Sequence, residues 1–298
     1  MRLLLLLLLS MLLFMACNQS ESTTEKSVPY RYWLSNSVRS NGIRLHYWRT
    51  GGAGKPVMIM AHGITDYGLN WSSLAAKFEN SYDIIMYDAR GHGFSQKPDS
   101  SYSLSIHVED LKGLIDALDI KKPILVGHSM GGSIVAMTAA TYPDLPAAVI
   151  MEDPPMDEML EQLITDIIPD WKKMVTDQNT MPKEKLIILA RTKYHPGWTA
   201  FEYDHWAEAK HLVVPQVIDV LEGEGFGNPQ TIFPKITAPA LILKADAEEK
   251  NRERHIATAA LLPNGNLIHV KGAGHLIRLD KPEIAEREIR AFLNNLSL

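Results

Sequence analysis

The chain has 298 residues, of which 46% are hydrophobic and 22% are charged. These proportions are ordinary for a globular protein, and the length suffices for one large α/β domain with an inserted subdomain. The formal net charge is −5 and no basic run occurs, which argues against a nucleic-acid partner.

The first sixteen residues form an apolar leader. Arg2 precedes an almost unbroken hydrophobic run from Leu3 to Ala16. The run is too short to span a bilayer comfortably and is typical of the central part of an export signal. A buried helix is the alternative, but it would need seven consecutive leucines to be covered on all sides. We therefore expect residues 1–16 to be a signal peptide.

Cys17 is the only cysteine, so no intramolecular disulfide can form. Its place behind the small Ala16 resembles the processing site of bacterial lipoproteins, although Phe14 stands where that family usually has leucine. The resemblance implies that Cys17 becomes the N-terminus and carries lipid, palmitate included. It also implies export to the bacterial cell envelope, with membrane contact through this lipid alone, in the periplasm or at the cell surface. The polar residues 17–29 predict a flexible tether.

The folded part is expected to begin near Tyr30. Residues 43–50 alternate apolar and polar side chains, which predicts a half-buried strand, and short, continuous apolar runs follow. Such runs are typical of strands that are covered on both faces. We predict strands over residues 43–50, 56–61, 83–87, 124–126, 147–151, 240–243 and 267–270. Apolar spacing predicts helices over residues 71–79, 105–118, 133–140 and 282–293. Strands that alternate with helices indicate a mostly parallel, doubly wound α/β sheet.

Residues 154–234 interrupt this alternation. They contain helical patterns, several prolines and many aromatic residues, but no clear strand. We interpret them as a helical lid over the carboxyl edge of the sheet, where ligand crevices form in open α/β sheets. The α/β core would then consist of residues 30–153 and 235–298. We interpret the aromatic residues mainly as the lid's own small core, because large apolar side chains are usually buried for packing.

The sequence Gly127-His128-Ser129-Met130-Gly131 lies between an apolar strand and a helix that starts with small residues. A match to Gly-x-Ser-x-Gly alone would occur by chance in roughly one chain in ten of this length. Its setting makes it informative, because a serine at a sharp strand-to-helix turn projects from the backbone above a helix N-terminus. The glycines would let neighbouring chain pass close to the strained serine. Ser129 is therefore the candidate nucleophile.

A nucleophilic serine needs a base, and the base needs an acid that orients it. His275 is the candidate base, because it follows the predicted strand 267–270 at the carboxyl edge of the sheet. The acid is expected after strand 240–243, where residues 244–249 contain three carboxylates. At most one of these carboxylates can face His275.

Negative charge on the substrate oxygen must also be stabilised. The turn at His62-Gly63-Ile64 follows strand 56–61 and would aim the Ile64 backbone N–H opposite the Met130 N–H, which predicts an oxyanion hole. We interpret His62 as a structural residue that bonds backbone in this turn. The chain has neither His-x-His nor His-Glu-x-x-His spacing, and we expect no metal and no cofactor.

Four segments together resemble the α/β-hydrolase superfamily: His62-Gly63, the block 88–95, the turn around Ser129, and Gly274-His275. The resemblance is strongest to lid-bearing esterases, lactonases, carbon–carbon-bond hydrolases and perhydrolases. It implies the α/β-hydrolase fold. Epoxide hydrolases and haloalkane dehalogenases of this fold use an aspartate nucleophile, so Ser129 argues against both activities.

The resemblance also bears on the acid. The family usually has a Gly-x-x-Asp pattern after its penultimate strand, and here that register reads Ala245-Asp246-Ala247-Glu248. Glu248 is therefore the first choice, because related hydrolases do use glutamate there, and Asp246 is the second. The third is Asp153, which follows strand 147–151, at a position from which some members supply the acid.

These observations predict a serine hydrolase that cleaves small, largely apolar carboxylic esters or lactones through an acyl-enzyme. A carbon–carbon-bond hydrolase of vinylogous diketones is the alternative, since it uses the same triad. A non-catalytic ligand-binding protein on the same fold is a third hypothesis, which the presence of both Ser129 and His275 disfavours.

Overall fold

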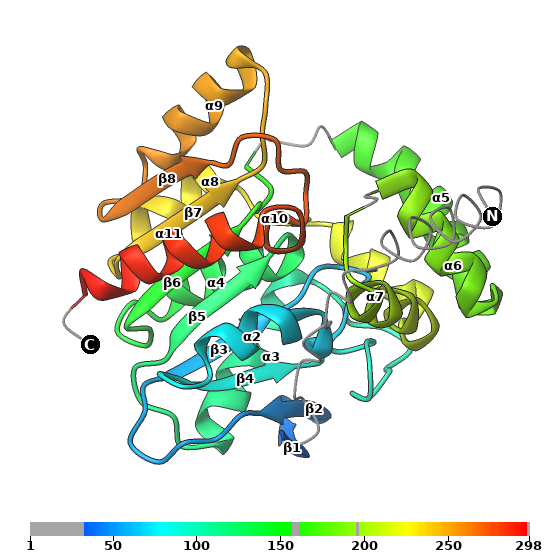
Figure 1. The fold of residues 1–298 in the computed structure, drawn as a ribbon, viewed down its shortest axis with the longest axis horizontal. Helices are drawn as coiled ribbons and strands as arrows, with labels where there is room; N and C mark the ends of the chain where they lie inside the picture. The colour runs from blue at the N-terminus through cyan, green and yellow to red at the C-terminus, as the bar shows by residue number, and fades with distance from the viewer. Residues whose placement is uncertain (1–32, 157–160, 195–196, 297–298) are drawn as a thin grey trace, which may run out of the picture.

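A computed structural model describes residues 33–156, 161–194 and 197–296. Within these ranges the strands form one eight-stranded sheet, with helices on both faces (Figure 1). The predicted signal peptide, the lipidation site at Cys17 and the tether lie outside the described residues. No helix in the described ranges is long and apolar enough to cross a membrane.

The sheet has the strand order β1-β2-β4-β3-β5-β6-β7-β8. β1 and β2 pair antiparallel, β2 pairs antiparallel with β4, and all other neighbours are parallel. This confirms the predicted mostly parallel α/β sheet. The strands are β1 (Leu34–Ser40), β2 (Ile43–Arg49), β3 (Val57–Ala61), β4 (Asp83–Tyr87), β5 (Ile124–His128), β6 (Ala148–Glu152), β7 (Ala240–Lys244) and β8 (Gly265–His269).

The central strands are buried along their whole length, which explains their continuous apolar sequences. Successive side chains alternate between the faces of the sheet. Met58 and Met60 of β3 pack in the same cluster as Phe78 of α2, whereas Ile59 packs with Leu111 of α3 on the opposite face. The helices of the core are α2 (Ser72–Phe78), α3 (Leu104–Ala117), α4 (Met130–Thr141), α9 (Glu249–Ala259), α10 (Ile277–Asp280) and α11 (Pro282–Asn294).

Between β6 and β7 the described chain contains helices and no strand. We call residues 161–221 the helical insertion. It consists of α5 (Glu161–Thr180), α6 (Lys183–Leu189), the π-helix η3 (Ala190–Tyr194), α7 (Ala200–Leu212) and the 3-10 helix η4 (Pro215–Leu221). Two further short helices, α8 (Pro229–Ile232) and η5 (Phe233–Lys235), pack against α4.

The helical insertion has its own apolar cluster, in which Leu186 of α6 packs with Trp198 and Tyr203. Helix α7 begins at a capping box, because the Thr199 hydroxyl accepts the Glu202 N–H while the Glu202 carboxylate accepts the Thr199 N–H. Figure 1 shows α5, α6 and α7 grouped beside the sheet. The insertion therefore has a small apolar cluster of its own, but it also joins the main core, in which Val175 of α5 and Val217 of η4 are buried.

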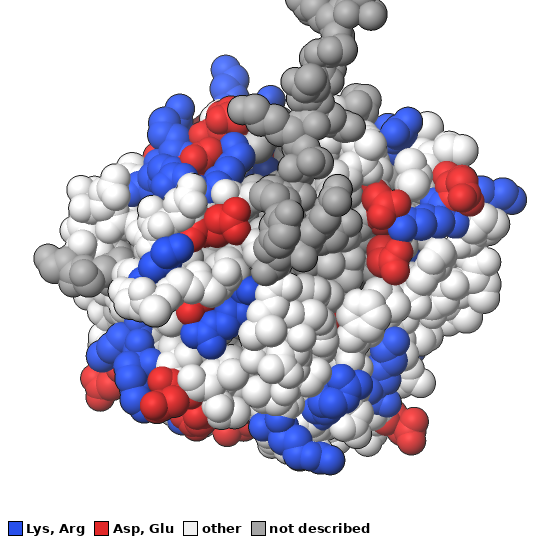
Figure 2. Space-filling view, turned by 60° about the horizontal axis from the view of Figure 1, so that its bottom comes forward, with Lys and Arg blue, Asp and Glu red and all other residues white. Residues whose placement is uncertain are grey.

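Charged side chains of both signs are interspersed on the face of the molecule in Figure 2. No broad patch of Lys and Arg is visible there, outside the grey atoms. That face offers no basic surface of the kind that nucleic acid requires.

Candidate active site

Ser129 joins the end of β5 to the start of α4. Its backbone lies at φ 52° and ψ −118°, a conformation that side-chain-bearing residues rarely adopt and that costs about 1–3 kcal/mol. Two backbone hydrogen bonds maintain it: the Ser129 N–H donates to Glu152 O at 3.0 Å, and the Ser133 N–H donates to Ser129 O at 3.2 Å. The turn is thus the sharp strand-to-helix elbow that the sequence predicts.

Glycines on either side of Ser129 permit this elbow. A Cβ atom on Gly127 would lie 2.1 Å from Gly131 O, and a Cβ atom on Gly131 would lie 2.1 Å from Ala61 O. No side chain fits at such distances, which confirms that neighbouring chain passes close to both positions. The α4 N-terminus is therefore packed directly against the end of β3.

His275 lies on the loop between β8 and α10. Its Nδ1–H donates a hydrogen bond to Asp153 Oδ2 at 2.5 Å. The other carboxylate oxygen, Oδ1, accepts from Lys244 Nζ at 2.8 Å and from the Ala245 N–H at 3.1 Å. Because Nδ1 carries the proton shared with Asp153, Nε2 of His275 is left as the basic atom.

The choice of Glu248 as the partner of His275 is corrected by this geometry. Glu248 is the exposed N-cap residue of α9, and Asp246 accepts the Gly272 N–H at 2.7 Å and pairs with Arg252. Asp153, the third choice, follows β6, which lies next to the nucleophile strand β5 in the sheet. A carboxylate at the end of the strand adjacent to β5 is close enough to reach a histidine that serves Ser129.

Buried charge around Asp153 favours its ionised form. Burial alone would raise the pKa of Asp153, but the His275 hydrogen bond and the Lys244 ammonium outweigh this effect and hold the pKa below its ordinary value. Asp153 is therefore a carboxylate at neutral pH. It can hold His275 in one tautomer and stabilise an imidazolium.

Ser129 and His275 line the same cavity. No hydrogen bond joins Ser129 Oγ to His275 Nε2 among the described contacts. In free enzymes of this kind such contacts are often long and tighten when substrate binds. The structure thus brings a candidate nucleophile and a candidate base to one cavity, with the candidate acid bonded to the base.

The turn after β3 supplies a second half of the site. Ile64 lies in this turn and Met130 is the first residue of α4, and neither backbone N–H has an acceptor among the described residues. The Ile64 carbonyl is fixed from behind, because His92 Nε2–H donates to it at 2.7 Å. Ile64 lines the cavity together with Ser129, and Met130 follows Ser129 directly in the chain, so both N–H groups belong to segments next to the nucleophile, where an oxyanion hole is expected.

His62 is a structural residue of this turn. Its Nε2 accepts the Ala89 N–H at 3.0 Å, so Nδ1 carries the proton and donates to Gly63 O at 2.8 Å. Burial lowers the pKa of His62 to about 3. The imidazole is thus neutral, with both nitrogens engaged by backbone, which confirms the interpretation that it is not a second base.

Residues 56–177 match a family model described as the alpha/beta hydrolase fold. The 2-(acetamidomethylene)succinate hydrolase of Mesorhizobium japonicum is 27% identical over 277 residues, which cover 88% of this chain and 96% of that protein. A crystal structure of E-2-(acetamidomethylene)succinate hydrolase superposes with a TM-score of 0.76 at 24% identity, over 88% of this chain and 100% of the other. The chain has the α/β-hydrolase fold.

Epoxide hydrolases are also similar to this chain. Mouse epoxide hydrolase 4 is 31% identical over 129 residues, so the match spans 43% of this chain and only 36% of that relative. A crystal structure of epoxide hydrolase A from Mycobacterium thermoresistibile superposes with a TM-score of 0.72 at 22% identity, over 89% of this chain and 99% of the other. Proteins named for different hydrolase activities therefore share this fold.

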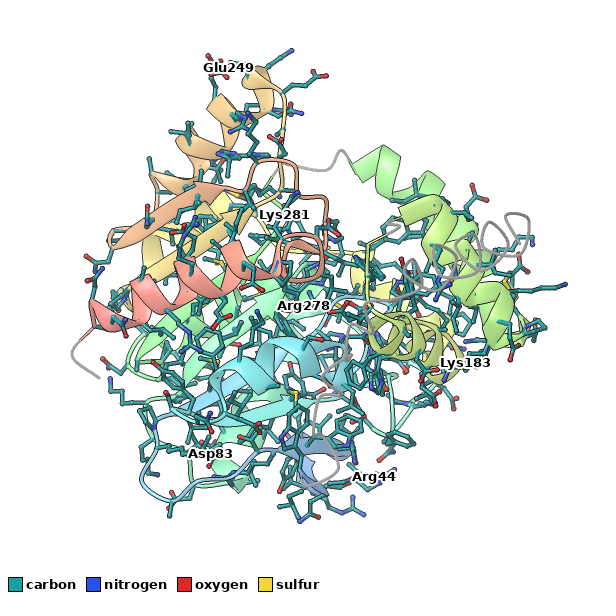
Figure 3. All side chains as sticks on the ribbon, in the orientation of Figure 1. Arg44, Asp83, Lys183, Glu249, Arg278 and Lys281 are labelled. Carbon is teal, nitrogen blue, oxygen red and sulfur yellow. The ribbon has the colours of Figure 1, made fainter. Side chains whose placement is uncertain are left out.

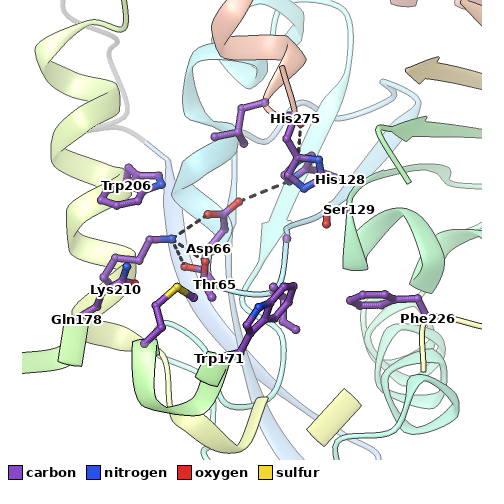
Figure 4. A pocket seen from close by; sticks show the side chains of 14 residues that line it. Thr65, Asp66, His128, Ser129, Trp171, Gln178, Trp206, Lys210, Phe226 and His275 are labelled. Atoms are coloured by element: carbon purple, nitrogen blue, oxygen red, sulfur yellow. Dashed lines mark hydrogen bonds and ion pairs between the residues drawn. The ribbon is translucent and has the colours of Figure 1, made fainter. Parts of the chain in front are cut away.

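The cavity of this α/β-hydrolase fold has a volume of about 350 Å³ and lies between the loops of the sheet edge and the helical insertion (Figure 4). Trp171, Trp206 and Phe226 form much of its apolar wall. The interpretation that the aromatic residues of this region serve mainly the lid's own core is therefore wrong for Trp171 and Phe226. Trp206 does both, since it also packs in the insertion's apolar cluster.

A buried charge network lines one side of the cavity and continues beneath it. Asp66 Oδ1 is 3.6 Å from Lys210 Nζ, and its Oδ2 is 3.6 Å from His128 Nδ1 and 3.9 Å from Arg278 Nη2. Arg278 also pairs with Glu152 at 2.8 Å, and Figure 3 places it in the centre of the molecule. Burial would raise the pKa of Asp66, but His128 and the two cations hold it well below its ordinary value. No pattern in the sequence predicts this network.

Lys210 joins the helical insertion to the oxyanion turn. Its ammonium donates to Thr65 O at 2.8 Å and to Thr65 Oγ1 at 2.7 Å, next to Ile64 in the chain. The ring of Trp206 covers it, with 4.5 Å from Nζ to the ring centroid. No group of three or more His, Cys, Asp or Glu side chains that could hold a metal ion occurs in the described ranges.

Proposed function

We propose that this protein is a serine hydrolase of small, largely apolar carboxylic esters or lactones. One observation carries the proposal: Ser129 stands on a strained elbow and shares a cavity with His275, whose Nδ1 is hydrogen-bonded to Asp153 at 2.5 Å. Each part has a defined task in acyl transfer and little use in a binding protein.

The reaction follows from these positions. His275 Nε2 accepts the Ser129 proton as Oγ attacks the carbonyl carbon, and the oxyanion accepts hydrogen bonds from the Ile64 and Met130 N–H groups. The imidazolium then protonates the leaving alcohol, or the ring-opened alkoxide of a lactone. Water, deprotonated by His275, attacks the acyl-enzyme and releases the acid. Asp153 stabilises the imidazolium in both halves.

Epoxide hydrolysis is a weaker candidate despite the similar relatives. Enzymes of this fold that open epoxides use an aspartate nucleophile, whereas this elbow carries Ser129. An alkyl-serine ether formed from an epoxide would lack the carbonyl that water attacks in an ester intermediate. We therefore expect no turnover of styrene oxide under conditions in which esters are hydrolysed.

Turnover of short p-nitrophenyl esters and labelling by a fluorophosphonate probe test the proposal. Wild-type protein should do both, and Ser129→Ala should abolish both. Ser133→Ala, four residues further along α4, is a matched control, because Ser133 is equally buried but lies outside the cavity lining. Ester turnover by Ser129→Ala at the wild-type rate would refute the proposal.

Carbon–carbon-bond hydrolysis of vinylogous diketones remains the second enzymatic candidate. The same nucleophile and base would serve it, and the long match to a hydrolase of a succinate derivative is compatible with a polar substrate. Cleavage of such a diketone without any ester turnover would favour this candidate. A protein that binds ligands but does not react with the probe would instead favour a non-catalytic role.

We also propose that Cys17 carries a lipid anchor that holds the enzyme at a membrane of the cell envelope. The support is the apolar leader at 1–16, the single cysteine behind Ala16 and the polar tether. Wild-type protein should fractionate with membranes in a bacterial host, and Cys17→Ser should release it. Soluble fractionation of both forms would contradict the anchor.

A further inference from the structure

Gln178 presents a carboxamide to the catalytic cavity and forms no side-chain hydrogen bond with the described protein. The residue lies on α5, is 7% exposed and lines the catalytic cavity. Its backbone carbonyl accepts a hydrogen bond from the Met181 N–H, but its side chain makes none with any described residue. The amide atoms of Gln178 are not among the fully buried side-chain atoms that lack a partner, so they are open to the cavity, where a polar substrate group can replace water as their hydrogen-bond partner.

The helix that carries Gln178 is anchored next to this residue. The neighbouring Asn179 ties α5 to α7, because its Nδ2 donates to Lys210 O at 2.5 Å and to Val213 O at 2.9 Å. Figure 4 shows Gln178 beside Lys210 on the wall formed by the helical insertion. Because the backbone of α5 is anchored here, the carboxamide stays on this wall of the cavity, and only its side-chain torsions have to be ordered when a ligand binds.

The charges around the cavity decide what kind of ligand group fits. The two carboxylates of the buried network, Asp66 and Glu152, are matched by two cations, Lys210 and Arg278. Lys210 already directs its N–H groups at Thr65 and Asp66, and Lys244 is paired with Asp153. A substrate carboxylate would therefore lose its water shell without gaining a free cation among the described lining residues.

We propose that Gln178 is a specificity-determining residue whose carboxamide hydrogen-bonds an uncharged carbonyl, amide or hydroxyl group on the part of the substrate remote from the scissile carbonyl. The proposal rests on the proposed serine hydrolase function and deepens it. The substrate class is thereby narrowed to esters or lactones with an apolar middle, facing Trp171 and Phe226, and a neutral polar end.

Three p-nitrophenyl esters with acyl chains of equal length test this class. The chains end in an isopropyl group, a methyl ketone or a carboxylate, which have similar shapes but differ in hydrogen bonding and charge. A second series carries the same groups on the alcohol side of the ester. In at least one series, kcat/KM for the ketone should exceed that for the isopropyl ester by about fivefold or more, and the carboxylate should be poorest.

Substitution of Gln178 assigns the preference to its side chain. Gln178→Met has nearly the same shape but no hydrogen-bonding group, so the ketone-to-isopropyl ratio should fall to about one. Gln178→Glu should lower kcat/KM for the carboxylate ester further, because the two negative charges repel each other. Gln216→Met is the matched control, because Gln216 is exposed on η4, and it should keep the wild-type ratio.

The outcomes separate this inference from the proposed function. A wild-type protein that hydrolyses none of the esters and does not react with the fluorophosphonate probe contradicts the serine hydrolase itself. A wild-type protein that hydrolyses all three esters without preferring the ketone overturns only the role of Gln178. A preference that survives in Gln178→Met also overturns it, and so does a carboxylate ester that is the best substrate.

Discussion

The loops at the carboxyl edge of the sheet and the helical insertion build the same cavity by different means. The sheet edge positions Ser129, Ile64 and Met130 through backbone geometry, with hydrogen bonds that run along neighbouring strands. The insertion contributes side chains such as Trp171 and Gln178, which project from helix α5. This difference suggests that the edge sets the reaction and the insertion sets the substrate.

Among the changes at the sheet edge, loss of the Asp153 carboxylate should lower the catalytic rate most. Asp153→Asn keeps the shape but favours the wrong tautomer of His275, so kcat should fall by about a thousandfold or more with little change in KM. Steady-state kinetics with a short p-nitrophenyl ester measure this. Glu248→Gln and Asp246→Asn are matched controls and should stay near the wild-type rate. A larger loss in Glu248→Gln than in Asp153→Asn would reverse the assignment of the acid.

The charge network beneath the edge should matter for stability rather than for substrate choice. Arg278→Met removes the cation that pairs with Glu152 and lies near Asp66. Both carboxylates would stay buried without this partner, so the free energy of unfolding should fall by about 3–5 kcal/mol. Urea denaturation measures this loss. Arg287→Met, on the exposed face of α11, should change stability by less than about 1 kcal/mol. Equal losses in both variants would mean that the buried network contributes nothing beyond a surface ion pair.

Lys210 tests whether the two regions are independent, because it links α7 to the oxyanion turn. Lys210→Met removes both hydrogen bonds to Thr65, so kcat should fall by about tenfold as the Ile64 N–H loses its fixed position. Lys183→Met is the control, since Lys183 pairs with Asp204 and Glu208 away from the turn. A change in KM alone would show that Lys210 serves the substrate and not the turn.

The site residues at the sheet edge can be predicted from the sequence more fully than those of the helical insertion, for a physical reason. The elbow at Ser129 and the turn at Ile64 are local: strained backbone demands glycine, and apolar strands precede each turn. The acid was misassigned because Asp153 and Glu248 both follow strands, and only the three-dimensional path of each loop decides which carboxylate reaches His275. The sequence carries no local mark of that path.

Strand β1, helix α9, the charge network and the position of Gln178 are not predicted from the sequence, because each lacks a local pattern. β1 is largely exposed and polar, and α9 buries few apolar side chains, so neither has a strong hydrophobic pattern. The charge network joins residues far apart in the chain, such as Asp66 and Lys210, and no spacing rule predicts such a contact. Gln178 has no local signal either, since a glutamine on a helix is ordinarily solvated.

The smallest expected effect concerns pH and the second contact between the regions. Tyr67, just after the oxyanion turn, meets His205 of α7, with 2.5 Å between the hydroxyl oxygen and Nδ1. Burial lowers the pKa of His205 to about 4, whereas the unfolded chain takes up its proton near 6.5. The unfolded state therefore binds more protons between these values, and stability should fall with falling pH by at most about 1.4 kcal/mol per pH unit from this residue.

His205→Gln keeps a polar partner for Tyr67 but cannot titrate, so the slope of unfolding free energy between about pH 6.5 and pH 5 should decrease. His211→Gln, on the exposed side of the same helix, is the control, and an unchanged slope in His205→Gln would show that His205 is not kept neutral in the folded protein.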